Sequence, residues 1–503
     1  MSPLDPAVFK GKRATLMGFA RTNVALARFL VRQGAEVTIT DTKPAEQLGP
    51  QIAQLADLPI RYTLGGHDER DFTDADVVFV SPGIPRTHHP LVAAAAREGV
   101  AISSEIELLF ELCPVPIAAI TGSAGKTTTT ILAGEMLRVS GLPTYVGGNI
   151  GTPLIDRLGD LPPDARVVLE LSSFQIQPLR RSPHVGAILN VTPNHLDDPR
   201  HPTLEAYRDA KANLIAHQRL DDVAVLGLDD PIASSLGTRG NGRKMFFSIE
   251  SPVVEGACMA GDELYVALGD LEAPICRRGD VKLRGEHNLR NLLAAAVVAG
   301  LRGATVEAMR QVATTFTGVE HRIEPVRELD GVRWYNDSKA TSPAETIAAL
   351  RSFEEPIVLI AGGRSKKAPL EEMAREIVAR SRALVLFGEM REEIRRAVET
   401  TPGAEKLAIR CAATLAEAVD AAHGLAQPGD VVLLSPSGTS FDAFADYEHR
   451  GRVFKELVEA LPRVVPVRLR AGEARPSPLS GAPVGGGPAE HPRAARRHSE
   501  TPR

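Results

Sequence analysis

The sequence has few cysteines and no long apolar run. Its 503 residues include four widely spaced cysteines and no CxxC pair; they are Cys113, Cys258, Cys276 and Cys411. This spacing argues against a zinc site and a disulfide framework, and it fits a reducing compartment. The most apolar run, residues 292–301, is too short to cross a bilayer, and the N-terminal stretch MSPLDPAVFKGKR lacks a signal-peptide core. We therefore expect a cytoplasmic protein without membrane insertion.

The sequence also lacks an excess of positive charge. Lys and Arg number 58 and Asp and Glu number 63, which gives a net charge of -5. Proteins that bind nucleic acid usually present a basic face, so this balance argues against nucleic acid as the main partner. Apolar residues make up 43% and charged residues 24% of the chain, as in ordinary soluble globular proteins. A chain of this length exceeds one hydrophobic core, which predicts two to four domains.

Short β-rich runs alternate with longer helical runs along most of the chain. In the first set, a strand at 13–19 and a helix at 23–34 precede strands at 36–41 and 76–85. The other sets have predicted strands at 117–120, 166–171, 185–192 and 223–228, and then at 356–363, 383–389 and 431–436. Strands that alternate with helices indicate βαβ units and hence parallel sheets.

These three sets predict an α/β protein of three domains in series. We place a Rossmann-like N-terminal domain at 1–108, a central P-loop mononucleotide-binding domain at 109–318, and a Rossmann-like C-terminal domain at 319–466. A tail at 467–503 follows, and Pro and Gly account for 11 of its last 33 residues. Such a composition cannot bury a core, so we expect the tail to be disordered.

The stretch AAITGSAGKTTTT, residues 118–130, is typical of a phosphate-binding loop. A buried strand ends before Gly122, and a helix begins after the turn. Gly122 and Gly125 let the backbone curl until its N–H groups point inward, while the helix N-terminus and Lys126 supply positive charge. The hydroxyl of Thr127 is placed to reach a metal ion on the phosphates.

One position departs from the GxxxxGK[ST] pattern of such loops. Ile120 stands where that pattern has its first glycine, so the loop is a variant. An ordinary glycine-rich turn between a strand and a helix is the alternative interpretation. The GKT triplet directly after a strand disfavours that alternative, and we therefore predict a nucleotide site.

Polar residues follow two further strands of the second set. Glu170 lies at the end of one strand, and Asn190, His195 and Asp197 follow the next. The carboxyl ends of parallel strands face the ligand crevice of an open sheet. Oxygen ligands at this edge would suit Mg²⁺ beside the phosphates, so we predict a metal site next to the loop.

Seven motifs occur in the order found in the Mur ligases, and the chain resembles this family from about residue 13 to about residue 461. The motifs are TGSAGKTTTT, GGNIGTP, LELSSFQ, NVTPNHLD, GEHNLRN, HRIE and NDSKATSP. The Mur ligases are ATP-dependent amide-bond ligases of peptidoglycan synthesis. NDSKATSP and LLSPSGTSFD resemble the branch that adds D-glutamate, and the DNPR-type signature of the diaminopimelate- or lysine-adding branch is absent.

The resemblance implies an activity and its participants. An ATP-dependent ligase of this kind phosphorylates the carboxylate of UDP-N-acetylmuramoyl-L-alanine, giving an acyl phosphate and ADP, and the amine of D-glutamate then displaces phosphate. It implies ATP and two Mg²⁺ ions as cofactors and these two small molecules as partners. It also implies a monomer whose third domain closes over ATP by a hinge motion.

The resemblance also assigns roles to matching positions. The expected catalytic residues are Lys126, Glu170, His195 and Lys211. The expected nucleotide contacts are Gly122, Ser123, Ala124, Gly125, Lys126, Thr127, Thr128, Asn288, Asn291, Arg322 and Asp337. The expected metal ligands are Thr127, Glu170, His195 and, if carbamylated, Lys211. The expected contacts to the UDP-substrate and D-glutamate are Thr22, Asp41, Thr42, Asn149, Ser172, Gln175, Lys339, Thr341, Lys366, Ser440 and Phe441.

For two of these lysines the sequence leaves a second interpretation open. Lys211, in YRDAKANL, matches the lysine that is carbamylated in the family. Addition of CO₂ would turn this cation into a carboxylate able to bind metal, whereas an unmodified surface lysine is the alternative. Lysines suit the carboxylates of D-glutamate as charge partners, and Lys367, beside Lys366, is the alternative for that contact.

The first turn of the N-terminal domain, GFARTN, departs from the GxGxxG pattern. Only Gly18 remains, with Ala20 and Asn23 at the other glycine positions. A dinucleotide needs close backbone approach at such a turn. The sequence therefore disfavours an NAD-linked enzyme, and it permits a single nucleoside diphosphate, in agreement with the implied UDP group.

Other functions stay open as alternatives. A sister Mur ligase would add a different amino acid or a dipeptide. Folylpolyglutamate synthetase is disfavoured because it lacks an N-terminal UDP-type domain. A non-catalytic regulatory protein would use the phosphate loop as a switch, but it would need no second metal site, and Glu170, His195 and Lys211 predict one.

Overall fold

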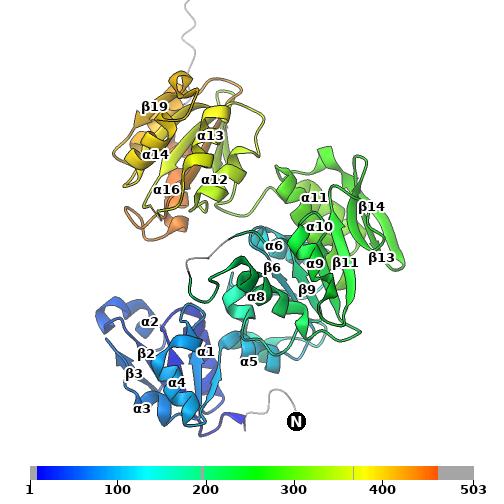
Figure 1. Ribbon diagram of the computed structural model, residues 1–503, viewed down its shortest axis with the longest axis vertical. Coiled ribbons are helices and arrows are strands. Elements are labelled where there is room, and N and C mark those ends of the chain that lie inside the picture. The colour runs from blue at the N-terminus through cyan, green and yellow to red at the C-terminus, as the bar shows by residue number, and fades with distance from the viewer. Residues whose placement is uncertain (1–7, 194–197, 366, 463–503) are drawn as a thin grey trace, which may run out of the picture. The chain divides into compact units, whose positions relative to one another are not determined.

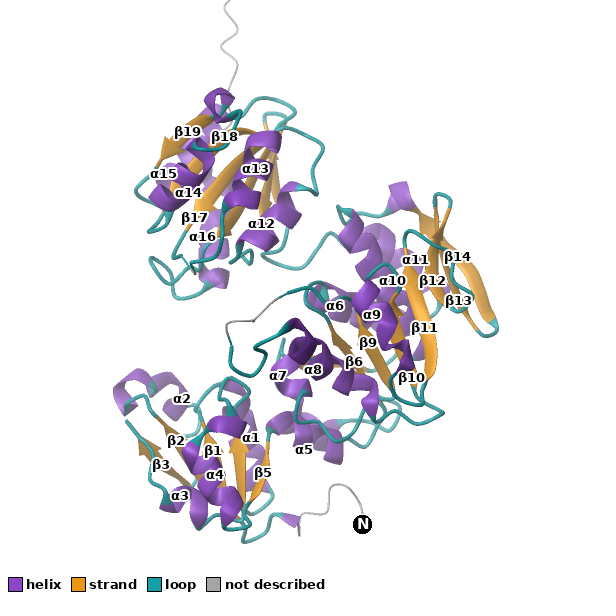
Figure 2. Ribbon diagram, viewed as in Figure 1, coloured by secondary structure: helices purple, strands orange, loops and turns teal. Residues whose placement is uncertain are grey.

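The computed structural model describes residues 8–193, 198–365 and 367–462. Three sheets follow one another along these residues (Figure 1). Helices pack against each sheet (Figure 2). The observed architecture is therefore the predicted one of three α/β regions, while the tail predicted to be disordered lies outside the described residues.

The first sheet has five parallel strands in the order β3-β2-β1-β4-β5. Its elements are β1 (Arg13–Met17), α1 (Arg21–Arg32), β2 (Glu36–Asp41), α2 (Gly49–Ala53), β3 (Ile60–Leu64), α3 (Arg70–Thr73), β4 (Val77–Val80), α4 (Pro90–Arg97), β5 (Ala101–Ser103) and α5 (Glu105–Leu112). The strand order reverses between β1 and β4, and ligands of open α/β sheets bind beyond the carboxyl ends at such a point. Gly18 follows β1 there, and a Cβ on it would lie 2.9 Å from Ser81 Oγ.

The second sheet has nine strands in the order β14-β13-β12-β11-β10-β9-β6-β8-β7. Its strands are β6 (Ile117–Thr121), β7 (Thr144–Gly148), β8 (Arg166–Glu170), β9 (Val185–Ile188), β10 (Val223–Gly227), β11 (Arg243–Ser248), β12 (Gly256–Ala260), β13 (Glu263–Leu268) and β14 (Leu271–Arg277). Its helices are α6 (Lys126–Val139), α7 (Ser173–Ile176), α8 (Leu204–Ala216), α9 (Pro231–Ser235), α10 (Glu286–Leu301) and α11 (Val306–Thr315). The pairs β12–β13 and β13–β14 are antiparallel, and the other pairs are parallel.

The third sheet has six strands in the order β15-β16-β20-β17-β18-β19. Its strands are β15 (Glu324–Leu329), β16 (Val332–Asn336), β17 (Ile357–Gly362), β18 (Ser381–Phe387), β19 (Ala408–Cys411) and β20 (Val431–Ser437). Its helices are α12 (Pro343–Leu350), α13 (Glu371–Arg380), α14 (Arg391–Glu399), α15 (Leu415–Leu425) and α16 (Tyr447–Ala460). Only β15 and β16 pair in antiparallel fashion among the described strands of this sheet.

The apolar run at 292–301 lies in α10. Residues 292–299 of this helix have no measurable exposure, because α10 packs between α6 and the central sheet. A helix that is apolar all round is a buried helix, and here it forms much of the central core. Among the described residues, no helix combines the length and apolar composition that a membrane crossing needs.

Two predicted strands are too long. Strand β4 ends at Val80 and β9 at Ile188, whereas the sequence predicts strands that continue to residues 85 and 192. The residues beyond both strands form loops at the carboxyl edges of their sheets. The side chains of Ser81 and Asn190 in these loops accept hydrogen bonds from Asn23 Nδ2 and from the N–H of Ala124, so the loops make tertiary contacts instead of longer strands.

Packing in the third region leads to a stability prediction. Phe454 on α16 is fully buried, and its ring centroid lies 6.3 Å from that of Trp334 on β16. Replacing Phe454 with alanine removes this contact and leaves a cavity, which is expected to lower the free energy of unfolding by about 3–5 kcal/mol. Urea unfolding followed by circular dichroism measures the change. Phe441→Ala is the matched control, because Phe441 is 62% exposed and its loss should cost less than about 0.5 kcal/mol.

Candidate active site

The predicted phosphate loop lies between β6 and α6. Gly125, the residue before α6, has a φ of +83°, a left-handed conformation that glycine adopts at little cost. A Cβ on Gly125 would lie 2.2 Å from Asn291 Oδ1. Glycine is therefore required here both for the turn and for the close approach of the loop to α10.

Asn190, directly after β9, holds the phosphate loop from the side. The backbone N–H of Ala124 donates to Asn190 Oδ1 at 2.9 Å, and Asn190 Nδ2 donates to the Ala124 carbonyl at 3.2 Å. The N–H of Ser123 donates to the Asn190 carbonyl at 3.0 Å. These bonds occupy two of the loop's N–H groups, so the first turn of α6, whose N–H groups have no partner within the helix, is left to receive phosphate.

Lys126 is the first residue of α6 and turns back over the loop. Its Nζ donates to the carbonyls of Gly122 and Ser123, at 2.9 and 3.2 Å. Burial lowers the pKa of Lys126, and the carboxylate of Glu170 opposes this by favouring the charged form. The lysine is thus a half-buried cation whose partners are neutral carbonyls, and phosphate oxygens could replace these carbonyls.

Lys211, on α8, reaches the same carbonyl from the opposite direction. Its side chain is 1% exposed, its Nζ donates to Gly122 O at 2.9 Å, and the ring centroid of Tyr207 lies 4.5 Å away. Burial, and then the positive charge of Lys126, lower the pKa of Lys211 well below its ordinary value. The alternative of a surface lysine is therefore excluded, because this amine is enclosed, and its surroundings favour the neutral form.

Glu170, the last residue of β8, faces the start of α6. Its Oε1 accepts a hydrogen bond from Asn149 Nδ2 at 3.0 Å. Its Oε2 is buried and has no hydrogen-bond partner among the described residues, and the same holds for the hydroxyls of Thr128 and Thr129. Buried polar atoms without partners are costly, and oxygen atoms of this kind are the ligands that Mg²⁺ prefers.

The described part of the predicted metal site is incomplete. His195 falls at 194–197, outside the described residues, as does Asp197. Over the described ranges, no group of three or more His, Cys, Asp or Glu side chains is close enough to hold a metal ion. The remaining predicted ligands are Thr127, Glu170 and Lys211, of which the lysine is a ligand only once it is modified.

Residues after β16 meet the start of α6. Lys339 Nζ donates to Thr127 Oγ1 at 3.2 Å, which joins two predicted site residues that are 212 positions apart. Asp337 is buried, and its carboxylate accepts from Ser435 Oγ at 2.8 Å and from the N–H of Ile323 at 3.2 Å. Burial raises the pKa of Asp337 to about 7, although the bond from Ser435 acts in the opposite direction.

Arg322 lies in a strained segment beside Asp337. The residues on either side of it, His321 and Ile323, have φ values of +64° and +44°. Such values are rare for residues other than glycine, above all for a β-branched one. Backbone strain of this kind is found where neighbouring structure fixes a functional segment, and the charge of Arg322 is felt at Asp337, Lys126 and Lys339.

The two predicted asparagines of α10 form a short chain of amides. Asn291 Nδ2 donates to Asn288 Oδ1 at 3.1 Å, and Asn288 Nδ2 donates to the Arg284 carbonyl at 2.7 Å. Both side chains are buried, and Asn291 lies against Gly125 of the phosphate loop. The helix therefore presents amides to the loop at the place where the sequence analysis predicts nucleotide contacts.

The predicted D-glutamate contacts lie on loops of the third region. Ser440 is buried and Phe441 is exposed, three and four residues after the end of β20. The N–H of Thr341 donates to Glu345 at 2.9 Å. Lys366 lies outside the described residues, and Lys367 is exposed, so the choice between these two lysines stays open.

The remaining predicted substrate residues have local partners. Ser172 and Gln175 form a capping box at the start of α7, in which each side chain accepts from the other's backbone N–H. These two bonds account for the presence of a serine and a glutamine at these positions, and no bound ligand is needed to explain them. The side-chain amide and the backbone N–H of Asn149 both donate to Glu170. A substrate contact by the Asn149 side chain would therefore use an amide that already bonds to Glu170.

Asp41 and Asn23 fasten the first turn of the N-terminal sheet. Asp41, at the end of β2, accepts from the N–H groups of Phe19 and Lys43, at 2.7 and 2.9 Å. Asn23 Nδ2 donates to the carbonyls of Met17 and Gly18. The asparagine at a glycine position of the GxGxxG pattern therefore closes the turn. Of the other predicted contacts in this region, Thr22 is half-buried on α1 and Thr42 is exposed after β2.

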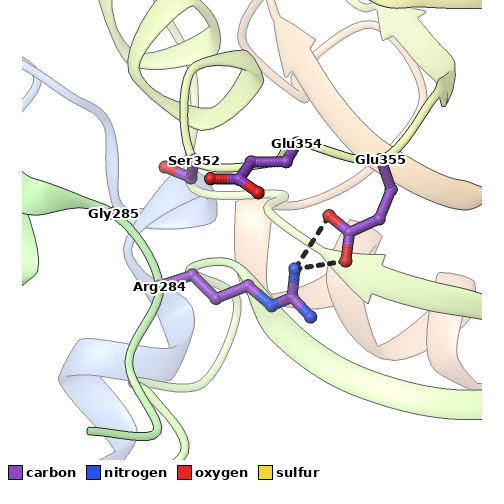
Figure 3. A pocket seen from close by; sticks show the side chains of 5 residues that line it. All are labelled: Arg284, Gly285, Ser352, Glu354 and Glu355. Carbon is purple, nitrogen blue, oxygen red and sulfur yellow. Dashed lines mark hydrogen bonds and ion pairs between the residues drawn. The ribbon is translucent and has the colours of Figure 1, made fainter. Parts of the chain in front are cut away.

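A pocket of about 410 Å³ lies between the segment that precedes α10 and the loop that joins α12 to β17, and its lining residues are Arg284, Gly285, Ser352, Glu354 and Glu355 (Figure 3). Arg284 Nη1 donates to both carboxylate oxygens of Glu355, at 2.9 and 3.0 Å, and Arg333 is a second partner of that carboxylate. Burial would raise the pKa of Glu355, but the two arginines outweigh it and hold the pKa at about 2. The pocket adjoins Asn288 through the Arg284 carbonyl and contains none of the predicted site residues.

The lowered pKa of Glu355 predicts that its contact with the two arginines is weakened in acid. Because the pKa of Glu355 is lower in the folded protein than its ordinary value of 4.5, its contribution to stability is present above pH 4.5 and is lost as the pH falls towards 2. Glu355→Gln should lower the free energy of unfolding by about 1–2 kcal/mol at pH 7, with a smaller difference at pH 3. Urea midpoints at both pH values give the comparison. Glu354→Gln, the same charge change on an exposed neighbour, should show no such pH-dependent difference.

The described fold and site define a class of protein. A phosphate loop bonded to two lysines, Lys126 and the buried Lys211, lies in a central α/β region, and residues of a following α/β region reach it through Lys339 and Thr127. Family models match these regions in order. Residues 12–104 match the Mur ligase MurD-like N-terminal domain, residues 120–299 the Mur ligase middle domain, and residues 321–438 the Mur ligase glutamate ligase domain. The chain belongs to the Mur ligase family.

Its curated relatives identify the branch. A protein of Symbiobacterium thermophilum named UDP-N-acetylmuramoylalanine--D-glutamate ligase is 47% identical over 452 residues, which are 90% of this chain and 98% of that protein. A protein of the same name from Trichlorobacter lovleyi is 43% identical and is covered to 99%. The family resemblance predicted from the seven motifs is confirmed, together with the branch that the two D-glutamate motifs indicated.

Solved structures share the three-region fold. The UDP-N-acetylmuramate-alanine ligase MurC of Thermotoga maritima matches with a TM-score of 0.57 at 19% identity, covering 89% of this chain and 99% of that one. MurF of Acinetobacter baumannii matches with a TM-score of 0.55 at 18% identity, covering 91% and 93%. At these identities the likeness concerns the fold alone, and it confirms the predicted fold class.

Proposed function

We propose that this protein is an ATP-dependent amide ligase that joins D-glutamate to UDP-N-acetylmuramoyl-L-alanine in cytoplasmic peptidoglycan precursor synthesis, acting as a monomer. The observation that carries the proposal is 47% identity across 98% of a relative whose name states this ligation. The site agrees with it, because a phosphate loop with its lysine, a buried acid and a buried second lysine lie together. The domain boundaries stay a prediction, at 1–108, 109–318 and 319–466.

ATP would be held by the central region with help from the third. Lys126 and the first turn of α6 suit the phosphates, since one supplies charge and the other N–H groups. Asn288 and Asn291 would contact the nucleotide from α10, and Arg322 and Asp337 from the third region. Lys339 already contacts Thr127, which supports a role for the third region in completing this site.

The residues present fit Mg²⁺. Glu170 Oε2 and the hydroxyls of Thr128 and Thr129 are buried oxygens without partners among the described residues, and the Thr127 hydroxyl lies at the same helix start. We assign Thr127 and Glu170 to one ion, and His195 and the modified Lys211 to a second. Bound there, Mg²⁺ would offset the negative charge that develops on the phosphate oxygens.

Lys211 has the surroundings that carbamylation needs. Only a neutral amine adds to CO₂, and burial beside Lys126 favours the neutral form of Lys211. In the addition, the amine nitrogen forms a bond to the carbon of CO₂ and loses one proton, so a neutral group becomes a carbamate anion. The positive charge of Lys126 would then stabilise the product that it helped to form.

The chain's own residues would act mainly by position and charge. A carboxylate is a poor acyl donor at neutral pH, so transfer of a phosphoryl group from ATP activates it, and the amine of D-glutamate then displaces phosphate. Lys126 would stabilise the charge that develops during the transfer. Lys339, Thr341, Ser440, Phe441 and one of the lysines at 366–367 would hold the incoming amino acid, with Thr22, Asp41, Thr42, Asn149, Ser172 and Gln175 assigned to the UDP-substrate.

Phosphate release tests the proposal. The protein is mixed with ATP, Mg²⁺ and UDP-N-acetylmuramoyl-L-alanine, and a panel of amino acids is added one at a time. Release that requires D-glutamate, and does not occur with L-glutamate, diaminopimelate or L-alanine, supports the proposed substrate. Release with another pairing would reassign the protein to a sister ligase, and no release with any Mur substrate would contradict a catalytic role.

A further inference from the structure

Arg450, on α16, is a fully buried arginine whose hydrogen bonds reach two loops of the third region. Its Nε and Nη2 donate to the hydroxyl and carbonyl of Ser338, at 2.9 and 2.8 Å, and its Nη1 donates to the carbonyl of Gly438 at 3.1 Å. The first loop, residues 337–341, follows β16, and the second, residues 437–441, begins at the end of β20. One side chain thus ties both loops together.

These two loops carry most of the residues assigned to the incoming amino acid. Lys339 and Thr341 belong to the 337–341 loop, and Ser440 and Phe441 belong to the 437–441 loop. A pocket built from two loops keeps its shape only while the distance between them is fixed. The rigid fork of a guanidinium group suits this task, since it can bond several acceptors in fixed directions.

The charge of Arg450 is not consumed by an ion pair. None of the ion pairs among the described residues includes it, and its bonded acceptors are a hydroxyl and two carbonyls. Burial lowers its pKa to about 10, while Asp442 and Asp337 act in the opposite direction. A buried charge without a bonded counter-ion is costly, and it favours an anion bound nearby.

The loop that Arg450 holds is strained. Ser437 has a φ of +68°, a left-handed conformation that is unusual for serine. Strained residues persist where their surroundings fix them, commonly at ligand clamps. The N–H of Ser437 donates to the carbonyl of Ala340 in the other loop at 3.0 Å, and Arg450 fixes the next residue, Gly438, so the strain lies at the junction of the two loops.

The helix is seated so that Arg450 reaches this junction. A Cβ on Gly451 would lie 2.2 Å from His321 Nδ1 and 3.0 Å from Asn336 Nδ2. Glycine at this position lets α16 approach the end of β16. The Arg-Gly pair at 450–451 therefore combines a close helix approach with a side chain directed at the two loops.

We propose that Arg450 is a positioning residue for the amino-acid substrate: it sets the spacing of the 337–341 and 437–441 loops and adds positive potential that favours a dicarboxylic amino acid. This inference rests on the proposed ligase function. The assigned nucleotide contacts come mostly from the phosphate loop, α6 and α10, and those to the UDP-substrate from the first two regions. Asp337, also assigned to the nucleotide, begins the 337–341 loop, but its carboxylate is held by Ser435 and by the N–H of Ile323, neither of which is a partner of Arg450. Loss of Arg450 should therefore act mainly on the amino acid.

Steady-state kinetics of Arg450→Lys and Arg450→Met test the proposal. Both variants should raise KM for D-glutamate by about 10- to 100-fold, the effect of losing hydrogen bonds to a charged group. KM for ATP and for the UDP-substrate should stay within about threefold. Lysine should not rescue, since it supplies the charge but not the fork.

Arg327→Met is the matched control. Arg327 also donates to backbone carbonyls at α16, those of Val458, Glu459 and Leu461, but at the far end of the helix from the two loops. Its loss should leave KM for D-glutamate unchanged. A KM for D-glutamate in Arg450→Lys within threefold of wild type would overturn the inference, as would equal increases of all three KM values in the Arg450 and Arg327 variants.

A milder variant covers the case in which Arg450 variants do not fold. Ser338→Ala removes the acceptor of Arg450 Nε and should raise KM for D-glutamate by about three- to tenfold; an unchanged KM would contradict the inference. Wild-type protein that does not respond to D-glutamate at all would contradict the proposed function. Wild-type activity with unchanged KM in the variants contradicts the role of Arg450 alone.

Discussion

Replacing Lys126 with alanine is expected to lower kcat for phosphate release by about 1,000-fold. Lys126 is held over the loop by the carbonyls of Gly122 and Ser123, so its charge is already in place when the phosphoryl group is transferred. A group positioned in advance lowers the barrier without reorganisation during the reaction. Binding of UDP-N-acetylmuramoyl-L-alanine, measured by calorimetry, should be retained, since its assigned contacts lie elsewhere.

Lys244→Ala is the control for Lys126→Ala. Lys244 belongs to the same sheet and also donates to two loop carbonyls, those of Gly240 and Gly242. It lies on β11, and it contacts none of the predicted site residues among those described. Its kcat should stay within about twofold of wild type. Near-normal turnover by Lys126→Ala would show that the phosphate loop is not the catalytic centre.

Replacing Lys211 with alanine is expected to lower kcat by about 100-fold, the upper end of the effect seen when groups that support a metal are removed. The amine of Lys211 is enclosed by Gly122, Thr121 and the ring of Tyr207. Loss of the side chain also leaves a space. A short carboxylate such as formate or acetate should enter it and restore part of the activity.

The rescue experiment distinguishes a carbamate at position 211 from an unmodified amine. A carboxylate can replace a carbamate as an anionic metal ligand, whereas methylammonium would replace a cation. Rescue by formate and not by methylammonium supports the carbamate, and intact-mass measurement of wild type under ¹³CO₂ gives an independent readout. Wild-type turnover by Lys211→Ala without any added carboxylate would falsify the assigned role.

The phosphate loop could be predicted from the sequence because its chemistry is contiguous. Gly122, Gly125, Lys126 and Thr127 lie within six positions, and the strand and helix beside them have clear apolar patterns. Lys211 is different, because its contact with Gly122 spans 89 positions. No spacing rule connects them, so only the family resemblance pointed to this lysine. Asn190 was visible as a polar residue after a strand, but its bonds to Ala124 depend on the loop's fold.

Some of the strands that the sequence did not predict are weakly patterned edge strands. Strand β7, TYVGG, contains two glycines, and β14, at the other edge of the same sheet, carries charged residues among apolar ones. Edge strands need little apolar surface, which removes the signal that the central strands provide. Arg450 gave no signal either, because its partners lie 12 and 112 positions away and an arginine in a helix normally faces solvent.

Trp334 makes the third region optically distinct. It is the only tryptophan in the chain, it is buried between His423 and Phe454, and it lies on β16, three residues before the loop that begins at Asp337. All tryptophan fluorescence therefore comes from β16, the strand that leads into the loop with Lys339. Titrating unlabelled protein with nucleotide or amino acid while recording this emission would report binding at that loop, because the other two regions contain no tryptophan.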